Sequence, residues 1–203
     1  RAVPSAPSDA AWQKVSEYSA ALLPQDLVEP RQLTATTTAV RIRAISNGTE
    51  TAFRLEWADP TCDDLPGAAR FCDACAVQIP QQAEVQVPAP QMGEAGRLVE
   101  IAYWNASRQA VVDGRGQSIK DLYPNAAVDH YPFEAQPLEN SPTSQQAMAT
   151  RYAPANAVGN QVAGLPSTPV QDLIAEGPGT LTSAATTSRG KGIRTANGWA
   201  VVI

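Results

Sequence analysis

The chain of 203 residues has a single histidine, His130, no long apolar run and no cluster of basic residues. A transmembrane helix needs about 20 consecutive apolar residues, so the lack of such a run predicts no membrane span. Nucleic-acid-binding proteins carry patches of Lys and Arg. Since this sequence has no such patch, we predict that the protein does not bind nucleic acid. With a formal net charge of −5, the chain instead suits a partner with a basic face, because opposite potentials speed encounter.

The scarcity of histidine also limits the enzyme classes. A Ser-His-Asp or Cys-His site would have to use His130, and its sequence neighbour Asp129 is poorly placed to orient it. No G-x-S-x-G motif occurs, and the Gly-x-Gly within residues 113–118 is not followed by the Lys-Ser/Thr of a phosphate-binding loop. The adjacent Asp63 and Asp64 stand in a turn-rich stretch typical of solvated carboxylates. We therefore predict no catalytic residue in this chain.

Cysteines are also few, and their number is odd: Cys62, Cys72 and Cys75. The C-x-x-C of residues 72–75 is followed by Ala76 rather than His, which excludes covalent attachment of a c-type haem. Neither a second C-x-x-C nor a pair of histidines completes a zinc site. The favoured interpretation is small buried apolar residues. A Cys62–Cys72 or Cys62–Cys75 disulfide in an oxidising compartment is the alternative.

Two stretches in the first half of the chain alternate apolar and polar residues with the period of a half-buried strand. They cover residues 39–46 and 51–57, and the Asn47-Gly48 pair between them is a strong hairpin signal. We predict an antiparallel pair of strands with one face towards the core and one face, carrying Arg and Glu, in water.

Three further strands follow the same pattern. Residues 75–80 and 97–104 alternate in this way, and Asn197-Gly198 marks a turn before a last apolar strand that ends at Ile203. The order of these elements predicts a mainly β fold, an antiparallel β-sandwich with long loops and one or two short helices. We expect a single domain over residues 1–203.

Two parts of the chain depart from this pattern, an N-terminal extension over residues 1–35 and a loop and helix excursion over residues 105–180. The excursion is rich in Pro, Ala, Asn, Gln and Gly, and most of it reads as irregular connections. Its best helix covers residues 140–153, where Ser141 is a favoured N-cap and Pro142 fits the first helical position. Loops of this length are usually functional or form interfaces. The Pro/Ser/Ala-rich start favours an exported protein.

One methionine, Met92, lies in an unusual setting. Pro88 and Pro90 precede it, Gly93 follows it, and an apolar strand begins soon after. Proline stiffens the backbone and glycine permits a sharp turn, so this segment predicts a firmly held thioether. Residue chemistry alone favours a methionine that packs in a core or loop. A thioether in that setting also suits an axial ligand of haem iron, where it raises the reduction potential.

Four segments of the chain resemble, in order and spacing, the haem-binding γ subunits of the ethylbenzene dehydrogenase and dimethylsulfide dehydrogenase group. The resemblance extends to the chlorate and selenate reductase subunits and spans most of residues 40–203. The segments are NGTETAFRLEWADPT (47–61), FCDACAVQIP (71–80), PQMG to GRLVEIAYWNAS (90–107) and RGKGIRTANGWAVVI (189–203). The stretches DHYPFEAQPLE (129–139), RYAPANAVGN (151–160) and PVQDLIAEGPGTL (169–181) resemble a branch described as ethylbenzene dehydrogenase-related.

This resemblance implies a fold, a cofactor and partners. The fold is a β-sandwich that holds one b-type haem between a Met and a Lys. The protein is periplasmic and lies beside an iron–sulfur β subunit and a molybdopterin α subunit. It relays electrons between that complex and a soluble cytochrome c, with no substrate chemistry of its own.

The same resemblance assigns roles to individual residues. Met92 falls on the family's methionine motif and becomes the first axial ligand. Lys191 is the choice for the second ligand, with Lys120, His130 or a lysine beyond Ile203 as alternatives. Tyr103 and Trp104 are expected in the pocket wall. A lysine binds iron only when neutral, so burial must lower its pKa and an exposed lysine does not qualify.

Two other functions are compatible with the same pattern. A carbohydrate- or ligand-binding β-sandwich without haem would stack Trp57, Trp104 and Trp199 on sugars. A purely structural subunit would bridge partners through the loops of the excursion.

Overall fold

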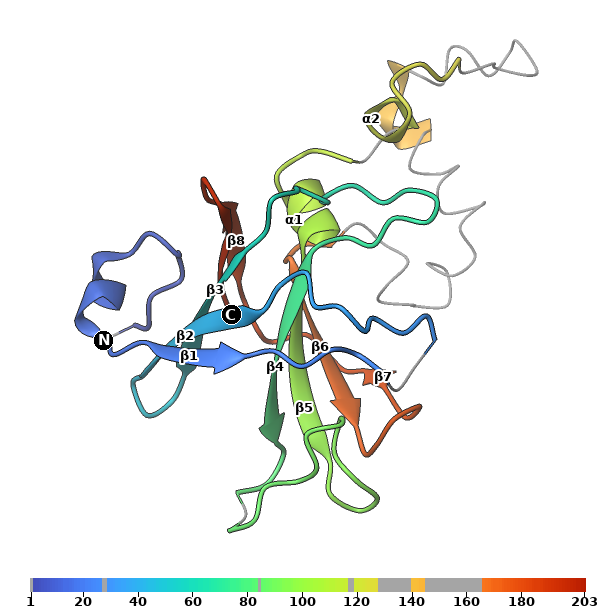
Figure 1. Cartoon of the computed structure of the whole chain (residues 1–203). Helices are drawn as coiled ribbons and strands as arrows, with labels where there is room; N and C mark the ends of the chain where they lie inside the picture. Colours follow the sequence, from blue (N-terminus) through green and yellow to red (C-terminus); the bar gives the residue numbers. More distant parts are fainter. Residues whose placement is uncertain (1, 27–28, 84, 117–118, 128–139, 145–165) are drawn as a thin grey trace.

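The structure is a computed structural model that describes residues 2–26, 29–83, 85–116, 119–127, 140–144 and 166–203. It is mainly β, with two antiparallel sheets and few short helices (Figure 1), so the predicted fold class is confirmed. Three short helices are described beside the sheets: the 3-10 helix η1 (Ala10–Lys14) and the α-helices α1 (Ala106–Val112) and α2 (Ile119–Leu122).

The first sheet has five strands in the order β1-β2-β3-β9-β8. Their bounds are Tyr18–Ala21 for β1, Ala39–Ser46 for β2, Thr51–Ala58 for β3, Gly198–Val202 for β9 and Lys191–Arg194 for β8. The predicted hairpin is confirmed: β2 pairs antiparallel with β3, and the Asn47 carboxamide oxygen accepts hydrogen bonds from the backbone N–H groups of Thr49 and Glu50 in the turn. The predicted turn at Asn197 is also confirmed, because it joins β8 to β9.

The second sheet has four strands in the order β4-β5-β6-β7. Their bounds are Ala74–Pro80 for β4, Val99–Asn105 for β5, Val170–Ala175 for β6 and Thr182–Ser183 for β7. The first two strands match the predictions for residues 75–80 and 97–104.

Part of the prediction for the excursion is wrong. Residues 170–175 were expected in an irregular connection, but they form β6, which pairs along its whole length with β5. Residues 106–112 form α1, whose N-cap Asn105 accepts a hydrogen bond from the backbone N–H of Ser107. The predicted cap at Ser141 is present, since its hydroxyl accepts a hydrogen bond from the backbone N–H of Ser144. Residues 145–153 of that predicted helix lie outside the described residues.

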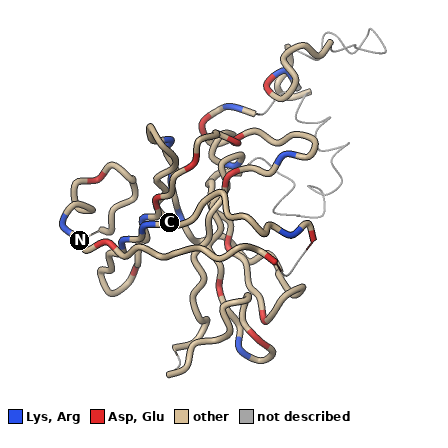
Figure 2. Tube along the Cα trace, in the orientation of Figure 1, with Lys and Arg blue, Asp and Glu red and all other residues tan. Residues whose placement is uncertain are grey.

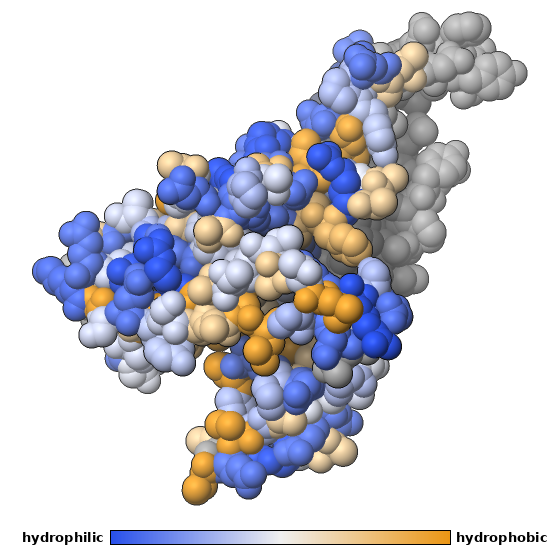
Figure 3. Space-filling model, viewed as in Figure 1, coloured by the Kyte–Doolittle hydropathy of each residue, from blue (hydrophilic) through white to orange (hydrophobic). Residues whose placement is uncertain are grey.

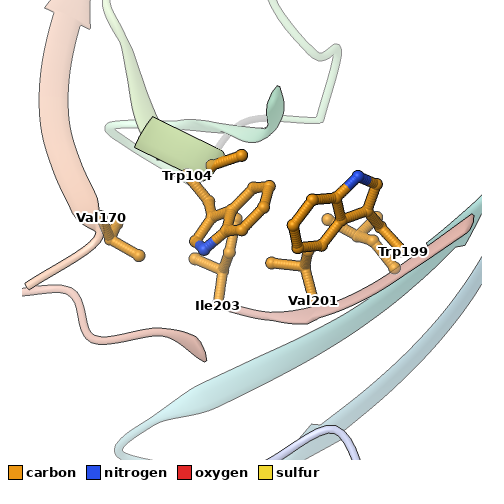
Figure 4. Close-up of a cluster of buried hydrophobic side chains, with 7 residues drawn as sticks. Trp104, Val170, Trp199, Val201 and Ile203 are labelled. Atoms are coloured by element: carbon orange, nitrogen blue, oxygen red, sulfur yellow. The ribbon is translucent and has the colours of Figure 1, made fainter. Parts of the chain in front are cut away.

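The two sheets pack face to face around three tryptophans. Trp104 on β5 contacts Trp199 on β9 and Trp57 on β3 edge-on, with ring centroids 5.2 and 6.2 Å apart. Figure 4 shows Trp104 and Val170 of the second sheet facing Trp199, Val201 and Ile203 of the first. Such edge-to-face pairs add to the stabilisation from burial.

Two features hold the Trp104 ring in place. Its indole N–H donates to the Gln109 side-chain oxygen on α1, which also accepts from the backbone N–H of Gly192 on β8. A Cβ at Gly192 would lie 2.1 Å from the Trp104 ring, so only glycine permits this approach. The contact between the Trp104 ring and β8 therefore requires glycine at position 192, the second glycine of the RGKGI segment.

The N-terminal segment covers part of the outer face of the first sheet, so the prediction of a wet face is confirmed only for residues such as Arg41, whose side chain is 54% exposed. Trp12 in η1 is 2% exposed and packs on Ala52 and Val202. The Arg54 guanidinium on the same face donates to the backbone oxygen of Pro7 at 2.8 Å. Figure 2 shows charges of both signs on the strands of this sheet. Where residues 3–15 cover it, this face is a second, smaller core.

Glu56 lies at the centre of that covered face. Its carboxylate is 2.6 Å from Arg54, 3.3 Å from Arg43 and 3.5 Å from Arg41, and Arg43 also pairs with Glu17 at 2.7 Å. The Glu56 side chain is only 12% exposed. A carboxylate this buried is tolerated only when it is paired, so the burial of Glu56 depends on the surrounding guanidinium groups.

All three thiols are free in the structure, so neither predicted disulfide alternative is formed. Cys75 on β4 packs on the core, and burial raises the pKa of its thiol well above the usual range. This placement confirms the buried apolar interpretation for Cys75, whereas Cys62 is exposed.

Candidate functional site

Met92 lies in the connection between β4 and β5, and its backbone is left-handed with φ of 62°. That conformation costs a residue other than glycine about 1–2 kcal/mol. Two hydrogen bonds hold the turn: Gly93 N–H donates to the Ala89 oxygen at 2.9 Å, and Gly177 N–H donates to the Met92 oxygen at 2.7 Å. The prediction of a sharply turned, firmly held methionine is confirmed for the backbone.

The local sequence explains this turn. Gly93 also has a positive φ, and a Cβ there would lie 2.8 Å from the backbone oxygen of Arg97. Beyond the turn, Arg97 pairs with Glu94 and donates to the backbone oxygen of Gln86. The turn is therefore fixed from both sides, and strain held in this way is common at functional positions.

The Met92 side chain is half-buried in a small apolar cluster. Its neighbours are Val99 and Ile101 on β5 and Leu173 and Ala175 on β6. Since side chains alternate along a strand and Trp104 points into the core, Val99 and Ile101 lie on the outer face of the second sheet. Met92 therefore closes one end of an apolar outer face.

Tyr103 and Trp104 lie on opposite faces of β5. Tyr103 follows Ile101 on the outer face, where its register partner is Gln171 on β6. Trp104 is 0% exposed and lies between the sheets. Of the two residues expected in a pocket wall, the structure brings only Tyr103 to the face that carries Met92.

Lys191 is not brought to Met92. On β8, Gly192 faces the Trp104 ring, so Lys191 faces the outer side of the first sheet, with Val202 as its register partner. Lys191 is also exposed. The two side chains thus project from opposite sides of the sandwich, and one iron cannot join them in this arrangement.

The other predicted donors do not complete the pair. Lys120 is exposed on α2, and His130 lies outside the described residues. Among the described residues, no group of three or more His, Cys, Asp and Glu side chains is placed to hold a metal ion. Met92 alone, of the donors predicted from sequence and described here, has a fixed backbone and an apolar setting.

A cleft of about 380 Å³ lies between α1 and β8. It carries cations and anions together: Arg115 and Arg194 line it, as do Asp64 and Asp113. Arg115 pairs with Asp64 at 2.8 Å, and Arg194 lies over the Trp199 ring at 5.5 Å from its centroid. The exposed Cys62 also lines this cleft, and burial raises the pKa of its thiol, so it is no activated nucleophile.

A second pocket of about 330 Å³ lies at the other end of the outer face from Met92. Tyr103 and Gln171 of that face line it, together with Ser107, Arg108 and Val111 of α1. Sequence reasoning missed this pocket because residues 106–112 were taken as part of the excursion. The available signal was Asn105, a favoured N-cap directly after an apolar strand.

The comparisons bear on the identity of this β-sandwich and its methionine turn. The family model described as ethylbenzene dehydrogenase matches residues 9–197. The chain belongs to the ethylbenzene dehydrogenase family. The match covers the second sheet, the Met92 turn, α1 and the first sheet up to β9, which begins at Gly198. A search of curated proteins gives no match.

Family membership makes this chain a subunit of an ethylbenzene dehydrogenase-like complex. No helix in the described ranges combines the length and the apolar character needed to cross a bilayer. The carbohydrate-binding alternative loses its main residues, because Trp104 and Trp199 are 0% and 4% exposed and cannot stack on a sugar.

Proposed function

We propose that this chain is the electron-transfer subunit of its complex and carries one b-type haem, with Met92 as an axial ligand. The observation that carries the proposal is the strained, doubly hydrogen-bonded turn that holds the Met92 side chain against an apolar sheet face. Membership of the ethylbenzene dehydrogenase family supports it. A positive φ is uncommon in residues other than glycine, and among the described residues Ala69 shares it with Met92.

The residues around Met92 fit one side of such a cofactor. The thioether is a soft donor that suits haem iron, and Val99, Ile101 and Leu173 exclude water around it. The haem supplies one-electron redox chemistry when bound. As a ligand, Met92 would favour the reduced iron and so raise the reduction potential of the haem. The apolar face would favour the redox state in which the haem site has the smaller net charge.

The second axial ligand is a separate question. The sequence-based prediction of Lys191 finds no support in its exposed position on the opposite side of the sandwich. Lys120 is also exposed, so it lacks the burial that a lysine ligand needs. The proposal therefore names Met92 alone as a ligand from the described residues.

The partners proposed for this subunit follow the same role. We place it in the periplasm, beside an iron–sulfur subunit and a molybdopterin subunit, with a cytochrome c as the electron partner. Its formal net charge of −5 would favour encounter with a basic cytochrome.

The test is to load the purified chain with haem and compare wild type with Met92→Leu. We expect wild type to take up one haem with a Soret band. Met92→Leu, which keeps size and apolar character, should lower the reduction potential and weaken haem binding by about 10-fold or more, because a ligand bond is lost. Met148→Leu, which replaces the chain's other methionine, is the matched control and should leave both values unchanged. Unaltered potential and affinity in Met92→Leu would rule out Met92 as a ligand.

A further inference from the structure

The second pocket contains an arginine, Arg108, for which no described residue is a charged partner. Arg108 Nε is buried and has no hydrogen-bond partner among the described residues. Its Nη2 makes one long hydrogen bond, 3.4 Å, to the backbone oxygen of Thr168. Burial lowers the pKa of this guanidinium, and the interaction with Tyr103 offsets only part of that effect.

Arg43 and Arg194 also have one buried nitrogen without a hydrogen-bond partner, but Arg108 differs from the other described arginines in having neither a carboxylate nor an aromatic ring as partner. Eight of them form an ion pair with a carboxylate, and Arg194 lies over the Trp199 ring. Arg108 is half-buried, and its buried Nε lacks the hydrogen bond that a desolvated polar atom needs. Arg108 therefore points to a partner that is no described residue of this chain.

The rest of the pocket favours an anion. None of the described residues that line it carries a carboxylate. The Tyr103 hydroxyl accepts a hydrogen bond from the Asn105 side chain at 2.9 Å, which leaves its own proton for an external acceptor. A guanidinium fork and a phenol in one pocket match the geometry and charge of a carboxylate.

The pocket lies on the same outer face of β5 and β6 as the Met92 cluster. Tyr103 and Gln171 are register partners two residues beyond Ile101 and Leu173, or about 7 Å along the strands. The same face therefore carries the thioether at one end and a cation at the other, while Val99 and Ile101 between them are 1% and 7% exposed. A ligand that reaches both ends needs an apolar body and an acidic edge, and it has to displace what covers these two residues.

We propose that Arg108 and Tyr103 form a carboxylate-binding site, and that the carboxylate is a propionate of the haem. The second part of this proposal rests on the proposed function. The shared chemistry, a carboxylate on a guanidinium, would also fit a small free carboxylate, so the experiment separates the two sources.

The experiment compares two cofactors in the whole chain. The apo-protein is titrated with haem and with its dimethyl ester, in which both propionates are neutral. Wild type should bind haem about 10-fold or more tightly than the ester, because one charged hydrogen-bonded pair is lost in the ester. Arg108→Gln should bind both equally, and Arg108→Lys should restore part of the preference. Arg115→Gln, a control in the other cleft, should keep the wild-type ratio.

A second measurement keeps this proposal separate from the proposed function. The Tm of the apo-protein is measured in sodium succinate and in sodium chloride at equal ionic strength, for wild type and Arg108→Gln. If no haem binds but succinate raises the Tm of wild type alone, the haem role fails and a free carboxylate is the ligand. If haem binds, the ester binds equally well to wild type and succinate has no effect, the carboxylate site is overturned. No haem binding together with no succinate effect overturns both proposals.

Discussion

The outer faces of the two sheets are built from the same kind of alternating strand, yet they differ in how their polar groups are satisfied. On the first sheet, Glu56 lies among three arginines and residues 3–15 cover the strands. On the second sheet, Arg108 has no carboxylate among the described residues, and Met92 is held in a strained turn beside apolar neighbours. The first face is complete within this chain, and the second has features that an external group would complete.

This difference separates stability from function. Substitution of a residue that serves only the fold should lower the stability of the protein and leave ligand binding intact. Residues kept for a ligand should show the opposite pattern, because their cost to the fold is already present in the free protein. The β4–β5 connection has an exposed apolar tip (Figure 3), where Val85 and Val87 are exposed. This tip adjoins the strands of the second sheet in the sequence and is not part of the outer face of the first sheet.

The largest effect is expected from uncovering the first face. Trp12→Ala removes a side chain that is 2% exposed and packs on Ala52 and Val202, so the free energy of unfolding should fall by about 3–5 kcal/mol. Urea denaturation measures this loss. Tyr18→Ala, at a site 69% exposed on the neighbouring strand, should cost about 0.5 kcal/mol or less. Similar losses at the two sites would show that the N-terminal segment does not cover the sheet.

Removing one charge from each face should sharpen the contrast. Glu56→Gln leaves three guanidinium groups without their shared carboxylate, and we expect a loss of about 3 kcal/mol in the free energy of unfolding. Arg108→Gln removes a charge with no carboxylate partner in the described part of the chain, so its effect should lie within about 0.5 kcal/mol of zero, or be stabilising. Denaturant titrations of both variants decide the matter. An equal loss in both would mean that Arg108 is paired within the folded chain.

The smallest effect concerns the segment that leads from the second sheet back to the first. Partial burial acts to raise the pKa of Asp172 on β6, but hydrogen bonds from Ser188 and Thr187 outweigh it and hold the pKa below its usual value. The folded state therefore favours the ionised carboxylate. Its contribution to stability is present above the usual Asp range and is lost as the pH falls through the lowered folded-state value.

The pH profile of Asp172→Asn tests this sign. The variant should be less stable than wild type near neutral pH, and the difference should shrink as the pH falls below about 4, where the unfolded-state carboxylate is protonated. Thermal unfolding at several pH values measures both curves. A difference that grows in acid would contradict the assigned direction.

Local patterns were enough to predict most of the strands. Asn47-Gly48 and Asn197-Gly198 gave correct turns because these pairs adopt the backbone that tight hairpins need. The turn at Met92 was predicted because the prolines before it stiffen the backbone and the glycine after it permits a sharp turn. Strand β6 was missed because both of its faces are partly covered, so its sequence VQDLIA does not alternate.

The cover of the first sheet and the unpaired Arg108 could not be predicted in this way. Trp12 covers a sheet about 40 residues further along the chain, and no local pattern records such a distant contact. Whether Arg108 has an ion-pair partner depends on where the fold places the carboxylates, which no local pattern records. The opposed faces of Lys191 and Met92 likewise follow from the strand register and the packing of the two sheets, which the RGKGI segment alone does not specify.

The most direct test of the central claim is an NMR spectrum of the reduced, haem-loaded protein with ¹³C-labelled methionine methyl groups. The chain has two methionines, so wild type should give two methyl signals. We expect one to shift far upfield, because a thioether bound to haem iron lies in the porphyrin ring current, and to vanish in Met92→Leu. Two unshifted methyl signals in the loaded wild-type protein, or a shifted signal that vanishes in Met148→Leu instead, would contradict the account.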